Sequence, residues 1–311
     1  MRVLVTGGAG YLGSHTVLTL LEAGHDVLVL DSLVTATTTA LERVAELAGT
    51  RLGGSRLRLH VADIRRPEDY RGALADFGPA ALVHFAGLKS PTESMTRPAA
   101  YYDVNVGGTA AVAEAALAAG ARTVLFSSSA TVYGDRAPVP VAEDAATDPV
   151  SPYGHSKLMA EQVLRDVCAM IDGGGLAMLR YFNPVGAHPS GRIGEDPSEV
   201  PNNLMPYIAQ VAVGKRDKLS VFGDDYDTVD GTGVRDYIHV MDLARAHADA
   251  IDLLARQDEQ APRVRAVNLG TGNGIVLKPA DETPRTAVAL ARLGHAVNGA
   301  LHLLIAGIAL Q

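Results

Sequence analysis

Residues 3–13 read Val3-Leu4-Val5-Thr6-Gly7-Gly8-Ala9-Gly10-Tyr11-Leu12-Gly13, a short apolar run followed at once by glycines. The apolar run is typical of a buried strand, and residues 12–23 carry apolar side chains at helical spacing. Between a strand and a helix, glycine lets the backbone turn tightly and lets a phosphate approach the helix N-terminus. This stretch therefore predicts the first β-turn-α unit of a sheet that binds an anionic ligand.

Short apolar runs and helical patterns alternate along the first 180 or so residues. The apolar runs are residues 27–30, 57–61, 81–85, 123–126 and 176–179, and the helical patterns are residues 39–47, 103–119 and 153–171. Such alternation is typical of repeated βαβ units that build a parallel sheet. We therefore expect an α/β fold with a doubly wound parallel sheet.

Asp31 follows the second apolar run and indicates which ligand the glycine turn serves. Its carboxylate can accept hydrogen bonds from both hydroxyls of an adenosine ribose but would repel a 2'-phosphate, which favours NAD over NADP. Asp63-Ile64, after the third apolar run, could hold the adenine end, or Asp63 could simply cap a helix. The sequence thus predicts a Rossmann domain that binds NAD.

The composition argues against several classes of partner. A net charge of -8 and a pI near 5.7 offer no basic surface to nucleic acid or to anionic lipid. The single cysteine, Cys168, can form no internal disulfide, and the start at Met1-Arg2 leaves no room for a signal peptide, so we expect a cytoplasmic protein. The acidic run at 224–231 departs from the EF-hand spacing, and the ten histidines show no ligand pairs, so we expect no metal.

The sequence after about Phe182 turns to loops rich in Pro, Gly and Asn, with helical patterns near 204–213 and 241–254. We expect residues 1–182 to form the NAD-binding Rossmann domain. Residues 183–274 are expected to form a smaller C-terminal substrate-binding lobe, which can include returning Rossmann elements. Residues 275–311 form an Ala/Leu-rich tail, whose glycines and polar side chains favour a packed helix over a membrane span.

Three polar residues suggest the chemistry. Ser129 closes a serine cluster at a strand end, and 24 residues later Tyr153 and Lys157 stand four apart, on one face of a predicted helix. To act as a base near pH 7, a tyrosine needs its pKa lowered from about 10, at a cost of about 4 kcal/mol. A lysine cation about 4 Å away supplies roughly that much at an effective dielectric constant of about 20. We therefore expect Tyr153, Lys157 and Ser129 to be catalytic.

These motifs resemble those of the extended short-chain dehydrogenase/reductase family, which is marked by an early glycine loop together with Tyr-x-x-x-Lys. Within it, longer stretches are similar to the UDP-glucose 4-epimerase family. They are Phe126–Gly134, Ser151–Gly154, Leu179–Ala187 and Gly233–Val240. The resemblance extends from residue 1 to about residue 274, and the tail beyond departs from the family.

The resemblance implies interconversion of UDP-glucose and UDP-galactose with NAD kept in the site. Tyr153 would take the proton of the sugar 4-hydroxyl while a hydride leaves C4 for NAD, and the hydride would return to the other face of the 4-keto sugar. The glycine loop and the resemblance together give the cofactor-binding residues Gly7, Gly10, Tyr11, Leu12, Gly13, Asp31, Ser32, Asp63, Ile64, Phe85, Ala86, Gly87, Lys89, Asn105, Tyr153, Lys157 and Tyr181. The resemblance gives the substrate-binding residues Ser129, Asn183, Asn202, Asn203, Leu204, Phe222 and Arg235.

Several alternatives stay open at this point. Asn202 and Asn203 could cap the helix that starts near Leu204 instead of binding sugar. A nucleotide-sugar dehydratase would carry an acidic pair just beyond the serine, where this chain has Ala130-Thr131. The unusual tail, for which a shifted reading frame is one hypothesis, also leaves open a catalytically impaired NAD-binding protein. The resemblance further implies a UDP-hexose as substrate and a homodimer formed through the helices at 103–119 and 153–171.

Overall fold

The computed structural model describes residues 1–171, 173–197, 201, 203–221, 225–228, 230–255 and 264–275. The chain divides into two compact units. The first comprises Met1–Tyr181 and Met241–Leu269, and the second comprises Phe182–Val240 and the residues from Gly270 onward. Helix α9 and strand β9, which lie late in the sequence, thus belong to the first unit.

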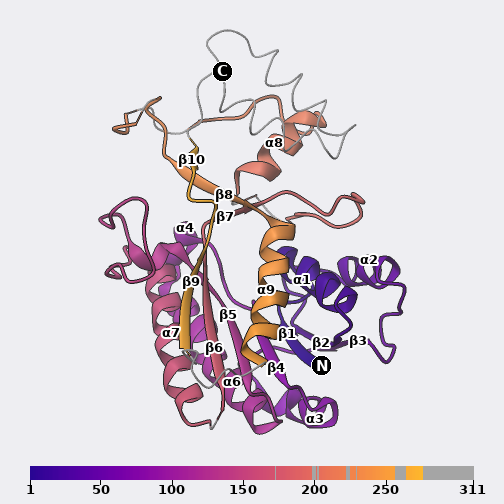
Figure 1. Cartoon of the computed structure of the whole chain (residues 1–311). Helices are drawn as coiled ribbons and strands as arrows, with labels where there is room; N and C mark the ends of the chain where they lie inside the picture. The colour runs from indigo at the N-terminus through magenta and orange to yellow at the C-terminus, as the bar shows by residue number, and fades with distance from the viewer. Residues whose placement is uncertain are drawn as a thin grey trace. The chain divides into compact units, whose positions relative to one another are not determined.

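The first unit is a seven-stranded sheet with helices on both faces (Figure 1). Its strands are β1 (Arg2–Thr6), β2 (Asp26–Asp31), β3 (Leu57–Val61), β4 (Ala81–His84), β5 (Thr123–Ser129), β6 (Gly175–Tyr181) and β9 (Val264–Leu269). They are ordered β3-β2-β1-β4-β5-β6-β9, and every neighbouring pair is parallel. The order reverses between β1 and β4, which is the mark of a doubly wound sheet, so the predicted fold class is confirmed.

The helices of this unit are α1 (Tyr11–Glu22), α2 (Thr39–Leu47), α3 (Pro67–Phe77), α4 (Pro91–Thr96), α5 (Pro98–Tyr102), α6 (Gly108–Ala118), α7 (Pro152–Ala169) and α9 (Val240–Ala255). One hydrophobic core joins α3, α6 and α7 to a face of the sheet, with fully buried contributors such as Leu4, Leu82 and Val124. Side chains alternate between the faces of a strand, so Val3 and Val5 point to the other face, where α1 and α9 lie (Figure 1).

The predicted helix at 103–119 is broken into two parts. A π-helical turn, η1 (Asp103–Gly107), precedes α6, and it follows α5 without a gap. At the start of α6, a Cβ on Gly108 would come within 2.6 Å of the Ile64 side chain, so the segment packs closely against the loop after β3. Helical periodicity does not reveal packing of this kind between distant parts of the chain.

In its described residues, the second unit contains a small sheet in the order β10-β8-β7 and a helix. Its elements are β7 (Asn183–Val185), α8 (Leu204–Ala212), β8 (Arg235–His239) and β10 (Gly274–Ile275). The Asp236 carboxylate on β8 accepts hydrogen bonds from the backbone N–H groups of Thr271 and Gly272, at 2.9 and 2.8 Å. Asp236 thereby holds the turn that leads into β10.

None of the helices in the described part of the chain combines the length and apolar character needed to cross a membrane. The described residues also contain no group of His, Cys, Asp or Glu side chains arranged to hold a metal ion.

Candidate active site

The glycine loop lies at the carboxyl end of β1, beside the point where the strand order reverses. Gly7 has a φ of +69°, and a Cβ there would stand 2.7 Å from the backbone nitrogen of Ala86. A Cβ on Gly13 would collide with the Gly7 carbonyl oxygen. Glycine is thus required at both positions, since the loop must pass close to the β4 end and to helix α1. Tyr11 and Leu12 begin α1 and are partly exposed.

Asp31 is tied to the same loop from the end of β2. Its Oδ2 accepts a hydrogen bond from the Ala9 N–H at 2.9 Å, and its Oδ1 accepts one from the Leu33 N–H at 2.9 Å. Each carboxylate oxygen keeps a second lone pair for another donor. Asp31 is therefore held in place by backbone and can still accept hydrogen bonds from a ligand, and Ser32 beside it is exposed.

Asp63 has an ionic partner that the sequence did not indicate. The Arg65 guanidinium donates to Asp63 Oδ2 at 2.5 Å and also to Asp103 Oδ2 at 2.6 Å. These hydrogen bonds lower the pKa of the Asp63 carboxyl, with the Arg65 side chain as the main cause. The N-cap residue of the next helix, α3, is Arg66, so Asp63 is not the cap of that helix. The neighbouring Ile64 is buried.

Asn105 fastens the loop after β4 to helix α7. Its Oδ1 accepts a hydrogen bond from the Leu88 N–H at 2.8 Å, while its Nδ2 donates to Leu88 O at 3.0 Å and to Ser156 Oγ at 2.9 Å. A Cβ on Gly87 would stand 2.9 Å from Asn105 Oδ1 and 3.9 Å from Lys157 Nζ. The loop at 85–89, which ends in the exposed Lys89, is thus set beside Lys157.

His84, to which the sequence assigned no role, is hydrogen bonded on both ring nitrogens beside the site. Thr109 donates to Asn105 O at 2.5 Å, so its oxygen accepts from His84 Nε2 at 2.8 Å. His84 Nδ1 then accepts from Thr6 Oγ1 at 2.6 Å, and Thr6 in turn accepts from the Ala86 N–H at 3.3 Å. Burial, aided by the Lys157 charge, lowers the pKa of His84 to about 3. A neutral imidazole therefore connects β1, the β4 loop and the η1-α6 segment.

Ser129, Tyr153 and Lys157 come together at the carboxyl end of β5. Ser129 ends β5, and Tyr153 is the second residue of α7, whose start is fixed by Pro152 and by Ser151 accepting from the Gly154 N–H at 3.2 Å. Tyr153 is 9% exposed and Lys157 is 5% exposed. Burial raises the pKa of Tyr153, and a hydrogen bond with Ser129 lowers it.

Lys157 is held by groups of β5. Its Nζ donates to the Ser127 carbonyl oxygen at 2.7 Å and lies 4.9 Å from the centre of the Phe126 ring. Burial lowers the pKa of Lys157 to about 8, while the Glu161 carboxylate raises it. The sequence argument gave Lys157 the main influence on the phenol, whereas in the structure burial and Ser129 are the causes that act on Tyr153.

Tyr181 ends β6 and has a partner on α9 that sequence analysis missed. Its hydroxyl and His247 Nε2 are 2.5 Å apart, and His247 Nδ1 donates to Leu243 O at 2.7 Å, so Nε2 accepts from the phenol. The His247 ring also lies 4.9 Å from the Phe85 ring, centre to centre. Burial lowers the pKa of His247 to about 4. His247 therefore stays neutral and orients two of the expected cofactor residues.

The expected substrate residues lie in the second unit, apart from Ser129. Asn183 begins β7, Arg235 begins β8 and is exposed, and Leu204 is the first residue of α8. Asn203 is at the N-cap position of α8, but its side chain does not cap the helix and instead donates to Glu195 Oε1 at 2.5 Å. Asn202 and Phe222 lie outside the described residues.

Together, the doubly wound sheet, its glycine turn and the buried tyrosine and lysine define a class: α/β enzymes that work with a dinucleotide. Comparisons with known proteins narrow this class. Residues 3–270 match the model of the NAD dependent epimerase/dehydratase family. The chain therefore belongs to that family.

Individual relatives are similar over most of the chain. The UDP-glucose 4-epimerase of Bacillus subtilis (strain 168) is 50% identical over 274 residues, which are 88% of this chain and 78% of the relative. A UDP-glucose-4-epimerase structure from Stenotrophomonas maltophila, with bound NAD and formylated UDP-arabinopyranose, is 48% identical with a TM-score of 0.81, covering 88% of this chain and 79% of that one. A Bifidobacterium longum enzyme in complex with NAD+ and UDP is 43% identical, with a TM-score of 0.81 and the same coverage.

Proposed function

We propose that the protein interconverts UDP-glucose and UDP-galactose as an NAD-dependent 4-epimerase. The observation that carries the proposal is the convergence of Ser129, Tyr153 and Lys157 at the end of β5, in a chain about half identical to UDP-glucose 4-epimerases. Ligands of doubly wound sheets bind at the carboxyl ends of the strands, which is where these residues gather.

The described residues fit NAD. The cradle made by Gly7 and Gly13 has no room for a Cβ, and Asp31 is fixed with lone pairs to spare for ribose hydroxyls. The loop at 85–89, Asn105, Lys157 and Tyr181 would hold the nicotinamide half. When bound, NAD supplies a hydride acceptor that returns the hydride within the same catalytic cycle.

Ser129 is set up to donate a hydrogen bond. Its Oγ accepts from the Thr131 N–H at 3.2 Å and from Thr131 Oγ1 at 2.9 Å, which occupies both lone pairs of the hydroxyl. The Ser129 proton is therefore available for an acceptor, such as the Tyr153 phenolate or the sugar 4-oxygen. A donor aimed at developing negative charge lowers the barrier to proton removal.

Tyr153 is the proton acceptor in this proposal. It would take the proton of the sugar 4-hydroxyl and return it after the 4-keto sugar has turned over, so that no net proton leaves the site. In this proposal the Ser129 hydrogen bond lowers the pKa of Tyr153 against its burial, and the buried Lys157 cation adds Coulomb attraction for the phenolate once it has formed. Arg235 offers a guanidinium fork that can bond two oxygens of a diphosphate.

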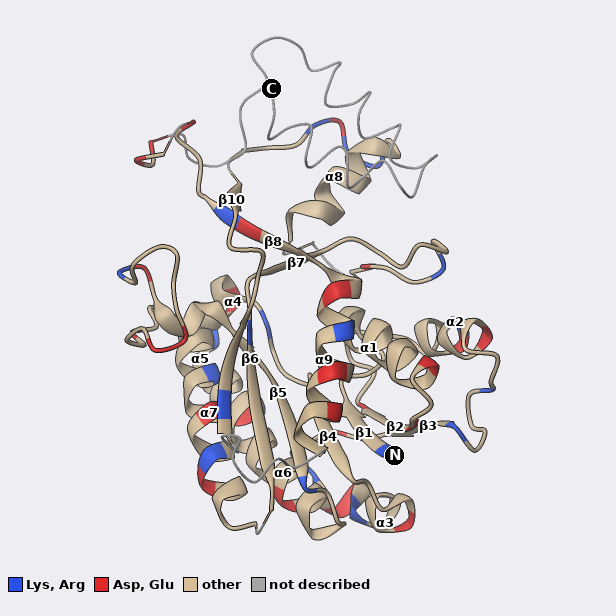
Figure 2. Ribbon diagram, in the orientation of Figure 1, with Lys and Arg blue, Asp and Glu red and all other residues tan. Residues whose placement is uncertain are grey.

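The wider assignments follow from the same reasoning. In the described part of the chain, Lys and Arg are interspersed with Asp and Glu, which suits a small nucleotide sugar better than nucleic acid (Figure 2). We propose a homodimer through residues 103–119 and 153–171, where Met159 of α7 is 47% exposed. A cytoplasmic location is proposed because the one cysteine, Cys168, is a buried free thiol.

The test is to incubate the purified protein with UDP-galactose and to measure the UDP-glucose formed, with Tyr153→Phe as the control. We expect conversion by the unmutated chain to an equilibrium mixture of the two sugars, and none by the control. Retention of NAD without any conversion would instead identify a catalytically inert NAD-binding protein.

A further inference from the structure

A group of polar side chains, buried except for one half-buried asparagine, adjoins the proposed catalytic residues along β5 and α7. We call Ser128, Tyr133, Glu161, Arg180 and Asn268 the Glu161 cluster. The Glu161 carboxylate accepts three hydrogen bonds: from Ser128 Oγ at 2.5 Å, and from Arg180 Nε and Nη2 at 2.9 and 2.7 Å. The Glu161 and Arg180 side chains are 2% and 5% exposed.

The cluster extends through Arg180 to a third strand. Arg180 Nη1 donates to the Tyr133 hydroxyl at 2.9 Å, and Tyr133 donates to Asn268 Oδ1 on β9 at 2.7 Å. Asn268 Nδ2 then donates to Val141 O at 3.0 Å. Val141 belongs to the segment that connects Ser129 to Tyr153 along the chain. The Glu161 cluster therefore joins β5, β6, β9, α7 and this connection.

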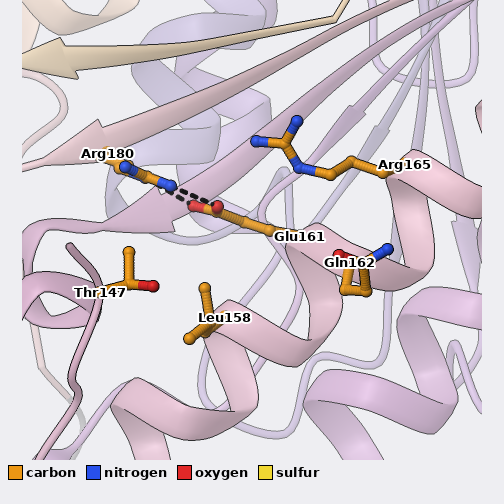
Figure 3. A pocket seen from close by; sticks show the side chains of 6 residues that line it. All are labelled: Thr147, Leu158, Glu161, Gln162, Arg165 and Arg180. Carbon is orange, nitrogen blue, oxygen red and sulfur yellow. Dashed lines mark hydrogen bonds and ion pairs between the residues drawn. The ribbon is translucent and has the colours of Figure 1, made fainter. Parts of the chain in front are cut away.

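Figure 3 shows the Glu161 and Arg180 side chains meeting at the wall of a cavity of about 380 Å³, with Arg165 beside them. The other residues on the cavity are Thr147, Leu158 and Gln162. An amide in place of the Glu161 carboxylate has the same size, but its NH2 group cannot accept from Arg180 or Ser128. Glu161→Gln therefore removes the charge together with at least one of these hydrogen bonds.

The neighbours of the cluster are the residues of the proposed chemistry. Ser128 stands between Ser129, which bonds Tyr153, and Ser127, whose carbonyl holds Lys157. Glu161 lies one helical turn beyond Lys157 and two turns beyond Tyr153 on α7. We propose that Glu161 is a positioning residue of the epimerase: bound by Ser128 and Arg180, it fixes the end of β5 against α7 and sets its negative charge one turn from Lys157. This inference rests on the proposed function.

Stability alone does not account for a buried ion pair here. Desolvation of two charges offsets most of their attraction, and well-packed apolar residues often stabilise as much. The pair does give a fixed geometry, since a bidentate arginine and a serine hold both carboxylate oxygens. Reacting groups need such fixing, because a displacement of about 1 Å can cost about a hundredfold in rate.

The charge of Glu161 also acts on Lys157. The groups that contact or act on Lys157 are Glu161 on α7, the neutral His84 on β4, and the Ser127 carbonyl and Phe126 ring on β5. Arg180 on β6 is bound to Glu161, and Tyr153 acts on Tyr181 of β6. Glu161 is the acidic member of this set, and its carboxylate opposes the burial that lowers the pKa of Lys157.

The experiment compares Glu161→Gln with Ser128→Ala. Glu161→Gln removes the charge and keeps the shape, so Lys157 should lose its proton at lower pH. We expect kcat with UDP-galactose to fall about tenfold at pH 8, and the alkaline limb of the kcat profile to move down by about one pH unit. Ser128→Ala leaves the charge in place, so kcat should fall about threefold to tenfold with the alkaline limb unmoved.

The matched control is Leu164→Ala, which removes a fully buried side chain from the same helix without touching a polar group. It should lower the melting temperature and leave the alkaline limb in place. The proposal would be overturned if Glu161→Gln and the unmutated protein had the same alkaline limb in their kcat profiles. It would also be overturned if Leu164→Ala moved that limb as far as Glu161→Gln does. If Glu161→Gln does not fold, Ser128→Ala decides, and an unchanged kcat there would refute the positioning role.

A second readout separates this inference from the proposed function. The melting temperature should rise with pH as the buried Lys157 loses its proton, and in Glu161→Gln the rise should begin at lower pH. This readout needs no turnover. A protein that converts no UDP-galactose but shows the displaced rise contradicts the proposed function while keeping the link between Glu161 and Lys157. If the melting temperature of Glu161→Gln begins to rise at the same pH as that of the unmutated protein, the link between Glu161 and Lys157 is contradicted.

Discussion

The two units of the chain hold their expected functional residues in different ways. In the first unit, Tyr153, Lys157, Asp31 and Asn105 are buried, and each is hydrogen bonded to groups of the sheet or its loops. In the second unit, Arg235 is exposed and its Nη1 donates to the carbonyl of the adjacent Val234 at 2.7 Å. The first set is oriented by the fold, whereas Arg235 keeps donors available for a ligand. Substitution of Tyr153 or Lys157 should therefore affect rate, whereas substitution of Arg235 should affect affinity for the substrate.

Of the substitutions that test this difference between the units, Tyr153→Phe should have the largest effect. Loss of the phenol oxygen removes the proton acceptor, so kcat should fall at least about a thousandfold. The ring would keep its volume and its edge contact with Tyr101, whose centre is 6.3 Å away, so the fold and the bound NAD should survive. Turnover of UDP-galactose and NAD released on denaturation measure the two properties. Residual turnover within tenfold of the unmutated protein would remove Tyr153 from its role.

Lys157→Met tests whether burial of this lysine makes the stability of the protein depend on pH. The ordinary lysine pKa of 10.5 falls to about 8 in the folded protein, a difference worth about 3 kcal/mol. Between those pH values the unfolded chain binds more protons, so the free energy of unfolding should rise with pH through this window. The rise should be absent in Lys157→Met. Unfolding in urea at pH 7, 8, 9 and 10 gives the comparison, and parallel curves for the two proteins would contradict it.

Arg235→Ala probes the second unit. Because the side chain is exposed, the melting temperature should change little, while KM for UDP-galactose should rise about tenfold to thirtyfold through loss of a charged hydrogen bond to the diphosphate. The kcat value should change by less than KM. Initial rates over a range of substrate concentrations separate the two constants. A loss confined to kcat would show that the two units do not divide rate and affinity in this way.

The sequence predicted those features that depend on local periodicity. The strands from β1 to β6 and the glycine turn were found because apolar runs and turn residues mark them directly, and the doubly wound sheet followed from their alternation. The return of α9 and β9 to the first unit was not assigned, because the partner of β9 is β6, far back in the chain. For the same reason the sequence did not indicate the partners of His84 and His247, because Thr6 and Tyr181 lie 78 and 66 residues away.

The smallest effect is expected from Asp63→Asn, which compares two aspartates of the first unit, Asp31 and Asp63. Both were expected to bind the adenosine half of NAD. Asp31 accepts from the backbone N–H groups of Ala9 and Leu33, whereas Asp63 accepts from the backbone N–H and the guanidinium of the partly exposed Arg65. Exposed ion pairs are worth about 0.2–1 kcal/mol. Asp63→Asn should therefore cost only a few tenths of a kcal/mol in stability and lower NAD affinity less than Asp31→Asn does.

The pH dependence of this small contribution has a definite sign. Arg65 lowers the folded-state pKa of Asp63 below its ordinary 3.8, so the stabilisation is present above pH 3.8 and is lost as pH falls through the lowered pKa. At neutral pH the ion pair is complete, and NAD titrations there compare the two aspartates under equal conditions. If Asp63→Asn weakened NAD binding as much as Asp31→Asn, Asp63 would have to leave Arg65 to bind the cofactor. Equal losses of NAD affinity in the two variants would thus show that the Asp63 carboxylate exchanges Arg65 for the cofactor. A small loss in Asp63→Asn would support Asp31 as the aspartate that binds the ribose.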